Sequence, residues 1–179
     1  MSYSSPLSRM AAWELRLCIT ANRISCRPVG WWLFTTVSRL GDGLFWFILI
    51  LSLPLCYGMK ALHPVVHLFI AGLCCVALSK GVKSGTTRPR PYQVEERIHR
   101  GGIPLDQYSF PSGHTLHAVA FSIIAAIYHP TLVWLVVPFT GLVAVSRVVL
   151  GLHYPSDVLA GAALGALVAL LTLPLVGGL

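Results

Sequence analysis

The chain has 179 residues, of which 55% are hydrophobic and only 11% are charged. Soluble proteins carry about 25% charged residues, so this composition excludes an ordinary soluble protein and predicts an integral membrane protein. The formal net charge of +7 favours anionic partners such as phospholipid headgroups or phosphate esters. The basic residues are scattered among apolar runs without a recognisable nucleic-acid-binding module, so we expect no nucleic-acid partner.

Residues 1–42 differ in pattern from the rest of the chain. Met10, Trp13 and Leu17 recur at roughly helical spacing, with basic residues such as Arg16 between them. This pattern predicts an N-terminal amphipathic helix that lies in the membrane interface with its apolar face toward the acyl chains. The alternative is a helix of the soluble type, packed on the domain.

Residues 43–179 are predicted to form an all-α, polytopic transmembrane helix bundle. Each uncharged run is about as long as a helix needs to cross a bilayer core. We expect five crossings, with a sixth if the N-terminal segment inserts. The predicted spans are Gly43–Met59, Ala61–Ser79, two within Tyr108–Ser146 that turn at His129-Pro130, and Val158–Leu179.

These spans place three polar segments on one membrane face. The second span ends in the polar loop 80–107, and the third begins near Gly113 on the same side. The fourth span returns there at Arg147, and the fifth leaves from Pro155. Each of the three segments is placed on this face by a different span boundary, so we expect them to form a single site there.

His153 and Asp157 lie at the connection between the last two predicted spans. Gly151 can end the preceding helix, and Pro155 suits the first position of the next, where its missing N–H costs nothing. We therefore expect His153 to be exposed at the top of a helix. Asp157 can accept a hydrogen bond from one imidazole nitrogen, which leaves the other as a nucleophile. Alternatively, Asp157 only complements the helix dipole, and His153 is an interfacial side chain.

Ser112, Gly113 and His114 follow Pro111 at the start of the third span. A helix N-terminus offers backbone N–H groups to a phosphate, Ser112 can cap the helix and donate its hydroxyl, and Gly113 permits close approach. His114 is placed to protonate a leaving alkoxide. The alternative is a serine-capped helix with a histidine at the membrane surface.

Three cations complete the candidate site: Lys83, Arg90 and Arg147. They can hold the equatorial oxygens of a phosphoryl group through its transition state. Arg147 ends a long uncharged run at the membrane edge, where an ionisable residue is costly and usually functional. The other arginines of the loop are interpreted as a basic surface: Arg88, Arg97 and Arg100.

The three segments resemble the signature of the type-2 phosphatidic acid phosphatase superfamily, which reads K-x6-R-P, P-S-G-H and S-R-x5-H-x3-D. Here these motifs are Lys83 to Pro91, Pro111 to His114, and Ser146 to Asp157, with every signature position matched in order. The signature covers about 75 residues. The predicted helices from 43 to 179 are compatible with the membrane-bound branch.

The resemblance implies a role for each residue. His153 would be the nucleophile that forms a phosphohistidine, Asp157 would orient it, and His114 would be the general acid and then the base that activates water. The phosphate would be held by Lys83, Arg90, Ser112, Gly113 and Arg147. The resemblance implies hydrolysis without a metal or other cofactor, and the five cysteines show no metal-ligand spacing.

The leading hypothesis is therefore a lipid phosphatase of the bacterial inner membrane, with undecaprenyl diphosphate as the first substrate candidate. Alternatives are a phosphatidylglycerophosphate or phosphatidate phosphatase, a lipid phosphotransferase with the same site, and a non-enzymatic scaffold. A soluble vanadium haloperoxidase does not fit the membrane spans.

Two features bear on the assembly and its orientation. Gly161 and Gly165 form a G-x-x-x-G motif that serves either a homodimer or packing within one chain. Twelve of the thirteen Lys and Arg residues fall on the catalytic side, and only Lys60 falls opposite. The positive-inside rule then predicts a cytoplasmic site, whereas the family resemblance implies a periplasmic one.

Overall fold

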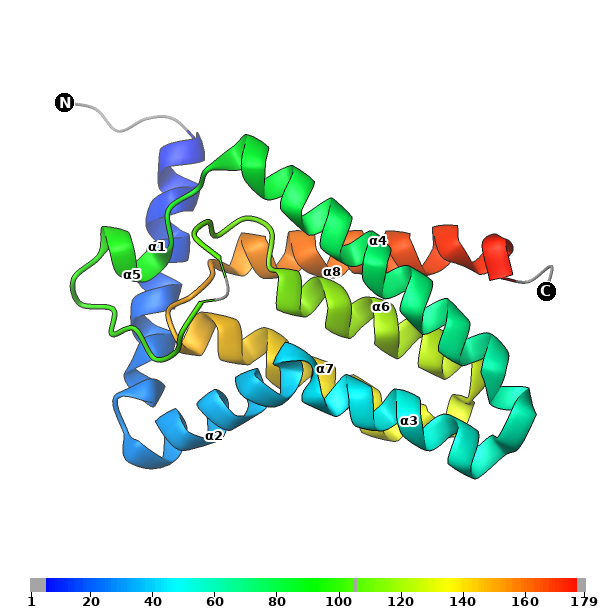
Figure 1. The fold of residues 1–179 in the computed structure, drawn as a ribbon. Helices are drawn as coiled ribbons and strands as arrows, with labels where there is room; N and C mark the ends of the chain where they lie inside the picture. Colours follow the sequence, from blue (N-terminus) through cyan, green and yellow to red (C-terminus); the bar gives the residue numbers. More distant parts are fainter. Residues whose placement is uncertain (1–5, 105, 177–179) are drawn as a thin grey trace.

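The computed structural model describes residues 6–104 and 106–176, and over these ranges the chain is helical without β-strands (Figure 1). The all-α prediction is confirmed. Residues 1–5 of the N-terminal segment and 177–179 of the last predicted span lie outside the described ranges. The α-helices are α1 (Pro6–Ser25), α2 (Pro28–Arg39), α3 (Phe45–Tyr57), α4 (Leu62–Thr86), α5 (Pro91–Val94), α6 (Gly113–Tyr128), α7 (Val133–Val149) and α8 (Pro155–Val176).

Short irregular turns connect several of these helices. A π-helical turn, η1 (Leu40–Leu44), joins α2 to α3, and a 3-10 turn, η2 (Gly58–Ala61), joins α3 to α4. A second 3-10 turn, η3 (Pro130–Leu132), connects α6 to α7 at the predicted position. Gly43 in η1 has φ of 147°, a backbone conformation that strongly favours glycine.

Three helical segments are long and apolar enough to cross a bilayer, judged by length and composition: Pro28–Val94, Pro130–Val149 and Pro155–Pro174. The first contains both α3 and α4, and α6 is apolar but shorter. The protein is therefore a multi-pass membrane protein, and the number of crossings stays a prediction.

One predicted boundary is wrong. The second span was expected to end at Ser79, but α4 continues to Thr86, so Lys80 and Lys83 lie on the helix rather than in the loop. Charge does not end a helix, because lysine can extend its ammonium group toward a polar region from a helical backbone. The helix ends where Thr87 adopts φ of 43°.

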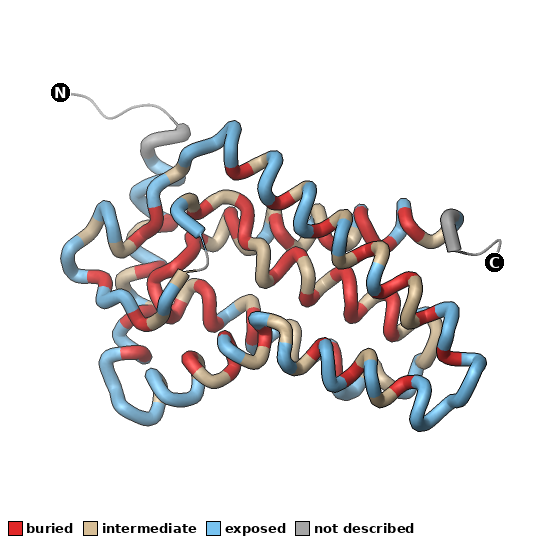
Figure 2. Tube along the Cα trace, in the orientation of Figure 1, coloured by how far each residue is buried: buried red, intermediate tan, exposed pale blue. Residues whose placement is uncertain are grey.

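The core of the bundle lies between α3, α4, α6, α7 and α8 (Figure 2). Gly161 and Gly165 of α8 face α6, since a Cβ atom built on them would lie 2.5 Å from the Ser112 carbonyl oxygen and 2.3 Å from that of Leu116. The G-x-x-x-G motif therefore brings two helices of the same chain together, and the homodimer hypothesis gains nothing from it.

Replacement of Gly165 by alanine is expected to destabilise the bundle. The added methyl group meets backbone, which cannot move aside without separating α6 from α8, so we expect a cost of about 1–3 kcal/mol and an apparent Tm about 2–10 °C lower in detergent. Gly141→Ala is the matched control, because nothing lies within 4 Å of a Cβ at that glycine of α7. Equal Tm values for the two variants would contradict the packing role.

Helix α1 runs across one end of the bundle and packs against α7 and α8 (Figure 1). In this helix most of the buried side chains are polar and several large apolar side chains are exposed, which is the reverse of the pattern in a soluble protein. The side chains that it turns toward the bundle are Glu14, Cys18, Asn22 and Ser25, whereas its exposed side chains include Met10, Trp13 and Leu17. The soluble alternative requires the apolar face to pack on the domain, and this helix presents that face outward.

Candidate active site

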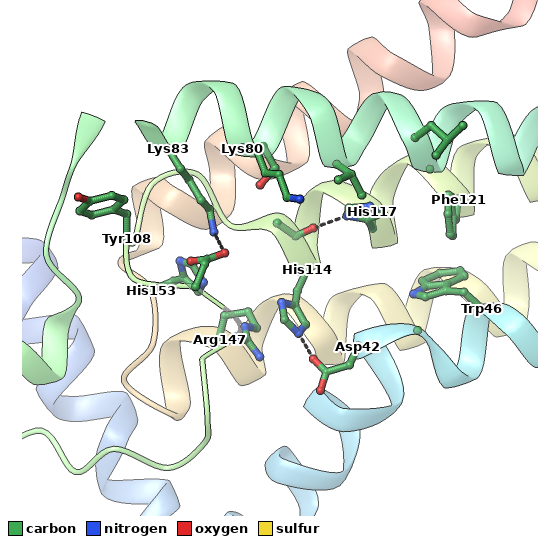
Figure 3. A pocket seen from close by; sticks show the side chains of 18 of the residues that line it. Asp42, Trp46, Lys80, Lys83, Tyr108, His114, His117, Phe121, Arg147 and His153 are labelled. Atoms are coloured by element: carbon green, nitrogen blue, oxygen red, sulfur yellow. Dashed lines mark hydrogen bonds and ion pairs between the residues drawn. The ribbon is translucent and has the colours of Figure 1, made fainter. Parts of the chain in front are cut away.

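A pocket of about 770 Å³ opens between α3, α4 and α6. Its inner end is polar and contains six of the eight predicted site residues, namely Gly113 and five residues with functional side chains. Its remaining wall is apolar and includes Trp46, Phe47, Phe69 and Leu73. Figure 3 shows the polar end of this pocket, where side chains from α4, α6, α7 and two loops point toward one another. The five are Lys83, Arg90, His114, Arg147 and His153.

His153 lies between α7 and α8, where Gly151 with φ of 71° ends the preceding helix and Pro155 begins α8 as predicted. The expectation that His153 is exposed is wrong, because only 1% of its surface is accessible. The prediction considered the connection alone, but α1 also covers it, with the Cys18 Sγ 3.9 Å from the His153 carbonyl oxygen.

The His153 ring is neutral and oriented for attack. Its Nε2 lies 3.2 Å from Arg90 Nη1. Because a guanidinium only donates, Nε2 is the acceptor and Nδ1 carries the hydrogen. Burial lowers the pKa of His153 to about 3, and the charges of Arg147 and Arg90 contribute, although Asp157 opposes the shift. Nε2 is therefore unprotonated at neutral pH, and in this structure its lone pair accepts the hydrogen bond from Arg90.

Asp157 lies directly behind His153 and outside the pocket. Its Oδ2 is 3.6 Å from His153 Nδ1, which is longer than a hydrogen bond, and Nδ1 has no other partner among the described residues. Ser109 and the Tyr154 backbone N–H donate to the same oxygen. The carboxylate is thus fixed where it faces the imidazole N–H.

Arg88 contacts a predicted site residue, although the sequence interpretation assigned it to the basic surface. Its Nη1 donates to Asp157 Oδ1 at 2.7 Å, and its Nη2 donates to Glu14 Oε2 at 2.9 Å. Glu14 also accepts the Ser156 N–H at 2.8 Å. Helix α1 therefore supports the carboxylate of the site through a buried acid and a shared arginine.

Two arginines are buried at the inner end of the pocket, and each has an Nε without a hydrogen-bond acceptor among the described residues. Arg147 is 2% exposed and donates to Ser38 through Nη1, while its Nε has no acceptor among the described residues. Arg90 is 1% exposed and also has an unpaired Nε. A buried cation with unpaired donors is costly, so this arrangement is suited to an anion that supplies the missing acceptors.

Asp106 is a second residue that the sequence interpretation missed. It pairs with Lys83, and its Oδ1 accepts from Arg90 Nη2 at 2.7 Å. Burial alone would raise its pKa, but the hydrogen bonds and charges of Lys83 and Arg90 hold the pKa of Asp106 below its ordinary value. The carboxylate therefore binds two of the cations that were predicted to hold phosphate.

Because an incoming phosphate competes with this carboxylate, Asp106→Asn is expected to bind inorganic phosphate more tightly. The Asp106 side chain is 42% exposed, so solvent weakens its ion pairs with Lys83 and Arg90 and their loss on phosphate binding costs little. We therefore expect the apparent Kd for phosphate to fall about 3- to 10-fold in Asp106→Asn, as measured by phosphate-dependent shifts in Tm. Glu96→Gln, an exposed change in the same loop, should leave this Kd unchanged. Weaker phosphate binding in Asp106→Asn would instead show that Asp106 orients the two cations.

His114 lies at the start of α6 and pairs through Nε2 with Asp42 of η1 (Figure 3). Asp42 belongs to the segment that was predicted to lie apart from the core, so its contribution was not anticipated. The glycines on either side allow the turn to approach: Gly41 packs against Val143, and Gly43 adopts the positive φ. A carboxylate on one ring nitrogen orients the imidazole.

Ser112 does not reach the pocket. It caps α6 as predicted, with its Oγ accepting the Thr115 N–H at 3.5 Å and lying 3.0 Å from the Thr115 hydroxyl. It is fully buried, and its N–H donates to the Asp157 carbonyl oxygen at 3.0 Å. Gly113 does line the pocket, where the first-turn N–H groups of a helix have no intrahelical acceptor.

A simple signal in the sequence could have identified the missed acids. The chain has only six Asp and Glu residues, and in a membrane protein each one needs a partner or a polar environment. Four of the six take part in the contacts described above: Glu14, Asp42, Asp106 and Asp157. No group of three or more metal-ligating side chains occurs within the described ranges.

The chain is similar in sequence to several curated bacterial proteins and in fold to solved structures. The chain is 42% identical over 106 residues to the bacitracin transport permease protein BcrC of Bacillus licheniformis, covering 59% of this chain and 52% of that protein. It is 30% identical over 112 residues to the undecaprenyl-diphosphatase BcrC of Bacillus subtilis, covering 63% and 58%. The chain thus spans just over half the length of these relatives.

The fold is similar to the crystal structure of LpxE from Aquifex aeolicus. The TM-score is 0.75 at 26% sequence identity, and the alignment covers 89% of this chain and 94% of that one. The sequence pattern of the PAP2 superfamily matches residues 60–178, which contain all three motifs and all eight predicted site residues. The chain therefore belongs to the PAP2 superfamily.

Proposed function

We propose that this protein is a membrane lipid phosphatase that removes a terminal phosphate through a phosphohistidine at His153. The observation that carries the proposal is the buried pair Arg90 and Arg147, each with an unpaired Nε, which line the inner end of an otherwise apolar pocket together with a neutral, buried His153. Such a site compensates a phosphoryl group electrostatically and excludes competing water.

The proposed reaction has two steps. In the first, His153 Nε2 forms a bond to phosphorus, the bond to the leaving oxygen breaks, and His114 donates a proton to that oxygen. In the second, His114 takes a proton from water, which attacks phosphorus and releases inorganic phosphate from His153. Asp157 stabilises the positive charge on the ring while phosphorus is attached, and the cations hold the equatorial oxygens throughout.

The apolar wall is suited to a lipid tail. Phe47 of α3 and Phe69 and Leu73 of α4 line the pocket and are also exposed on the outer surface. Helices α3 and α4 meet at η2 and diverge toward the catalytic end (Figure 1). We infer that a lipid enters sideways from the bilayer, with its headgroup at His153 and its tail between these two helices.

We further propose that the protein resides in the bacterial inner membrane, with α1 in the interface on the catalytic side. The outward-facing Met10, Trp13 and Leu17 suit contact with acyl chains, and the inward-facing Glu14 suits contact with the site. The side of the bilayer can be assigned by the reactivity of one engineered cysteine in the 93–107 loop with an impermeant reagent.

A phosphate-release screen of the purified protein tests the function. The panel contains a prenyl diphosphate, phosphatidylglycerophosphate, phosphatidate and a lipid A phosphate, each in detergent micelles with EDTA. We expect release from at least one prenyl diphosphate, which is the substrate that the relative from Bacillus subtilis is named for. Absence of release from every lipid, with a folded protein in the assay, would overturn the proposal.

A further inference from the structure

Lys80 is a second cation on the pocket side of α4. It lies one helical turn before Lys83 and lines the same pocket. In Figure 3 its side chain extends into the opening on the side of Lys83 that faces His117. The nearby carboxylate of Asp106 pairs with Lys83 and Arg90 rather than with Lys80.

The position of Lys80 along α4 places it between two different parts of the pocket. The lining residues of this helix run from Lys83 through Lys80 to Val76, Leu73 and Phe69. At 1.5 Å per residue, Lys80 lies about 4.5 Å from Lys83 along the helix axis, and Val76 lies about 6 Å further on. The ammonium group thus separates the catalytic cations from the apolar wall that suits a tail.

His117 lies at the corresponding position on α6, one turn beyond His114. It also lines the pocket, and its Nδ1–H donates to the Gly113 carbonyl oxygen at 2.9 Å, which fixes the ring. The pocket therefore has a second polar level, formed by Lys80 and His117 on two facing helices. A lipid monophosphate bound at His153 would place ester and hydrocarbon groups at this level, where a cation gains nothing.

We infer that Lys80 forms a subsite for the inner phosphate of a lipid diphosphate, with the His117 ring as the opposite wall of that subsite. This inference rests on the function proposed above and specifies its substrate class. With the terminal phosphorus at His153, the inner phosphate is the next group toward the tail, one bridging oxygen away. The second polar level lies directly between the site of bond cleavage and the apolar wall.

The subsite also stabilises the leaving group. When His153 Nε2 bonds to the terminal phosphorus, the bond from that phosphorus to the bridging oxygen breaks, and the lipid monophosphate leaves with the bonding electrons. Negative charge therefore increases on the inner phosphate in the transition state, and the Lys80 ammonium group beside it would stabilise this charge more than that of the bound substrate. Lys80 is expected to affect kcat/KM for diphosphates and to leave monophosphates nearly unaffected.

The test compares farnesyl diphosphate with farnesyl monophosphate, which share one tail. Lys80→Met is expected to lower kcat/KM for the diphosphate by about tenfold or more, since a charge-assisted contact to phosphate is lost. The monophosphate value should change less than about twofold, and Lys80→Arg should recover most of the diphosphate activity. Lys60→Met, an exposed lysine in η2 at the opposite end, is the matched control.

Each contrary outcome overturns a different statement. An equal loss on both substrates would show that Lys80 acts through general surface charge, and no loss would show that it does not contact the substrate. A wild-type protein that hydrolyses only monophosphates would overturn the diphosphate subsite and leave the phosphatase function standing. Inactivity of the folded wild-type protein on both substrates would overturn the subsite, and inactivity on the whole lipid panel as well would overturn the proposed function itself.

Discussion

Replacement of His153 by alanine is expected to lower phosphate release from lipid substrates by at least about 10⁴-fold. His153 Nε2 faces Arg90 at the inner end of the pocket, and an alanine at this position has no nucleophilic atom to replace it. Loss of a nucleophile that forms a covalent intermediate removes the whole two-step route, and comparable substitutions in other enzymes cost about as much.

The covalent step can be measured directly. Rapid acid-free quenching of wild-type protein with a radiolabelled lipid phosphate should trap a base-stable, acid-labile phosphohistidine that His153→Ala lacks. Because the ring is buried, His153→Asn serves as a smaller perturbation, and the Tm in detergent shows that both variants fold. His63→Ala, an exposed histidine near the far end of α4, is the matched control. Substantial turnover by both His153 variants would exclude the phosphohistidine route.

Replacement of His114 by alanine is expected to lower kcat/KM for a lipid monophosphate by about 10²- to 10⁴-fold, the usual contribution of a general acid. The loss should depend on the leaving group. An alkoxide needs the proton, whereas the phenolate of p-nitrophenyl phosphate leaves readily without it. With this aryl substrate, His114→Ala should form the phosphohistidine at nearly normal rate and then accumulate it, because water is no longer activated.

Two comparisons make this result specific. Asp42→Asn should reproduce part of the loss, because Asp42 pairs with His114 and orients its ring. His129→Ala, which lies at the opposite end of the bundle and stacks on Tyr57, should retain the activity on both substrates. Equal losses in the rate of phosphohistidine formation from the lipid and the aryl substrate would show that His114 binds phosphate rather than transfers a proton.

The sequence was sufficient to predict which segments come together at one face of the bundle. The three motifs lie next to predicted span boundaries, and the order of the spans brings them to one membrane face whatever the details of packing. His153, His114 and Arg147 meet in the pocket as expected. Local rules were also sufficient for the Pro155 helix start and for the Gly151 helix end, because both depend on one residue's own backbone geometry.

The supporting contacts could not be predicted in the same way. Asp106 and Arg88 lie in a loop whose course depends on the helices beneath it, and no periodicity specifies where such side chains point. Glu14 and Asp42 come from the first 42 residues, which were treated as a separate segment. Only the packing of α1 and η1 against the bundle brings these two acids to Arg88 and His114.

The sequence by itself determined that the protein spans a membrane, that it is helical, and which residues match the three motifs of the superfamily, since composition and motif order are properties of the chain alone. The tertiary structure decided the burial of His153, the carboxylates that face each catalytic group, and the position of Lys80 between the cations and the apolar wall. These features depend on distances between helices far apart in the chain, which are set by side-chain packing across the whole bundle.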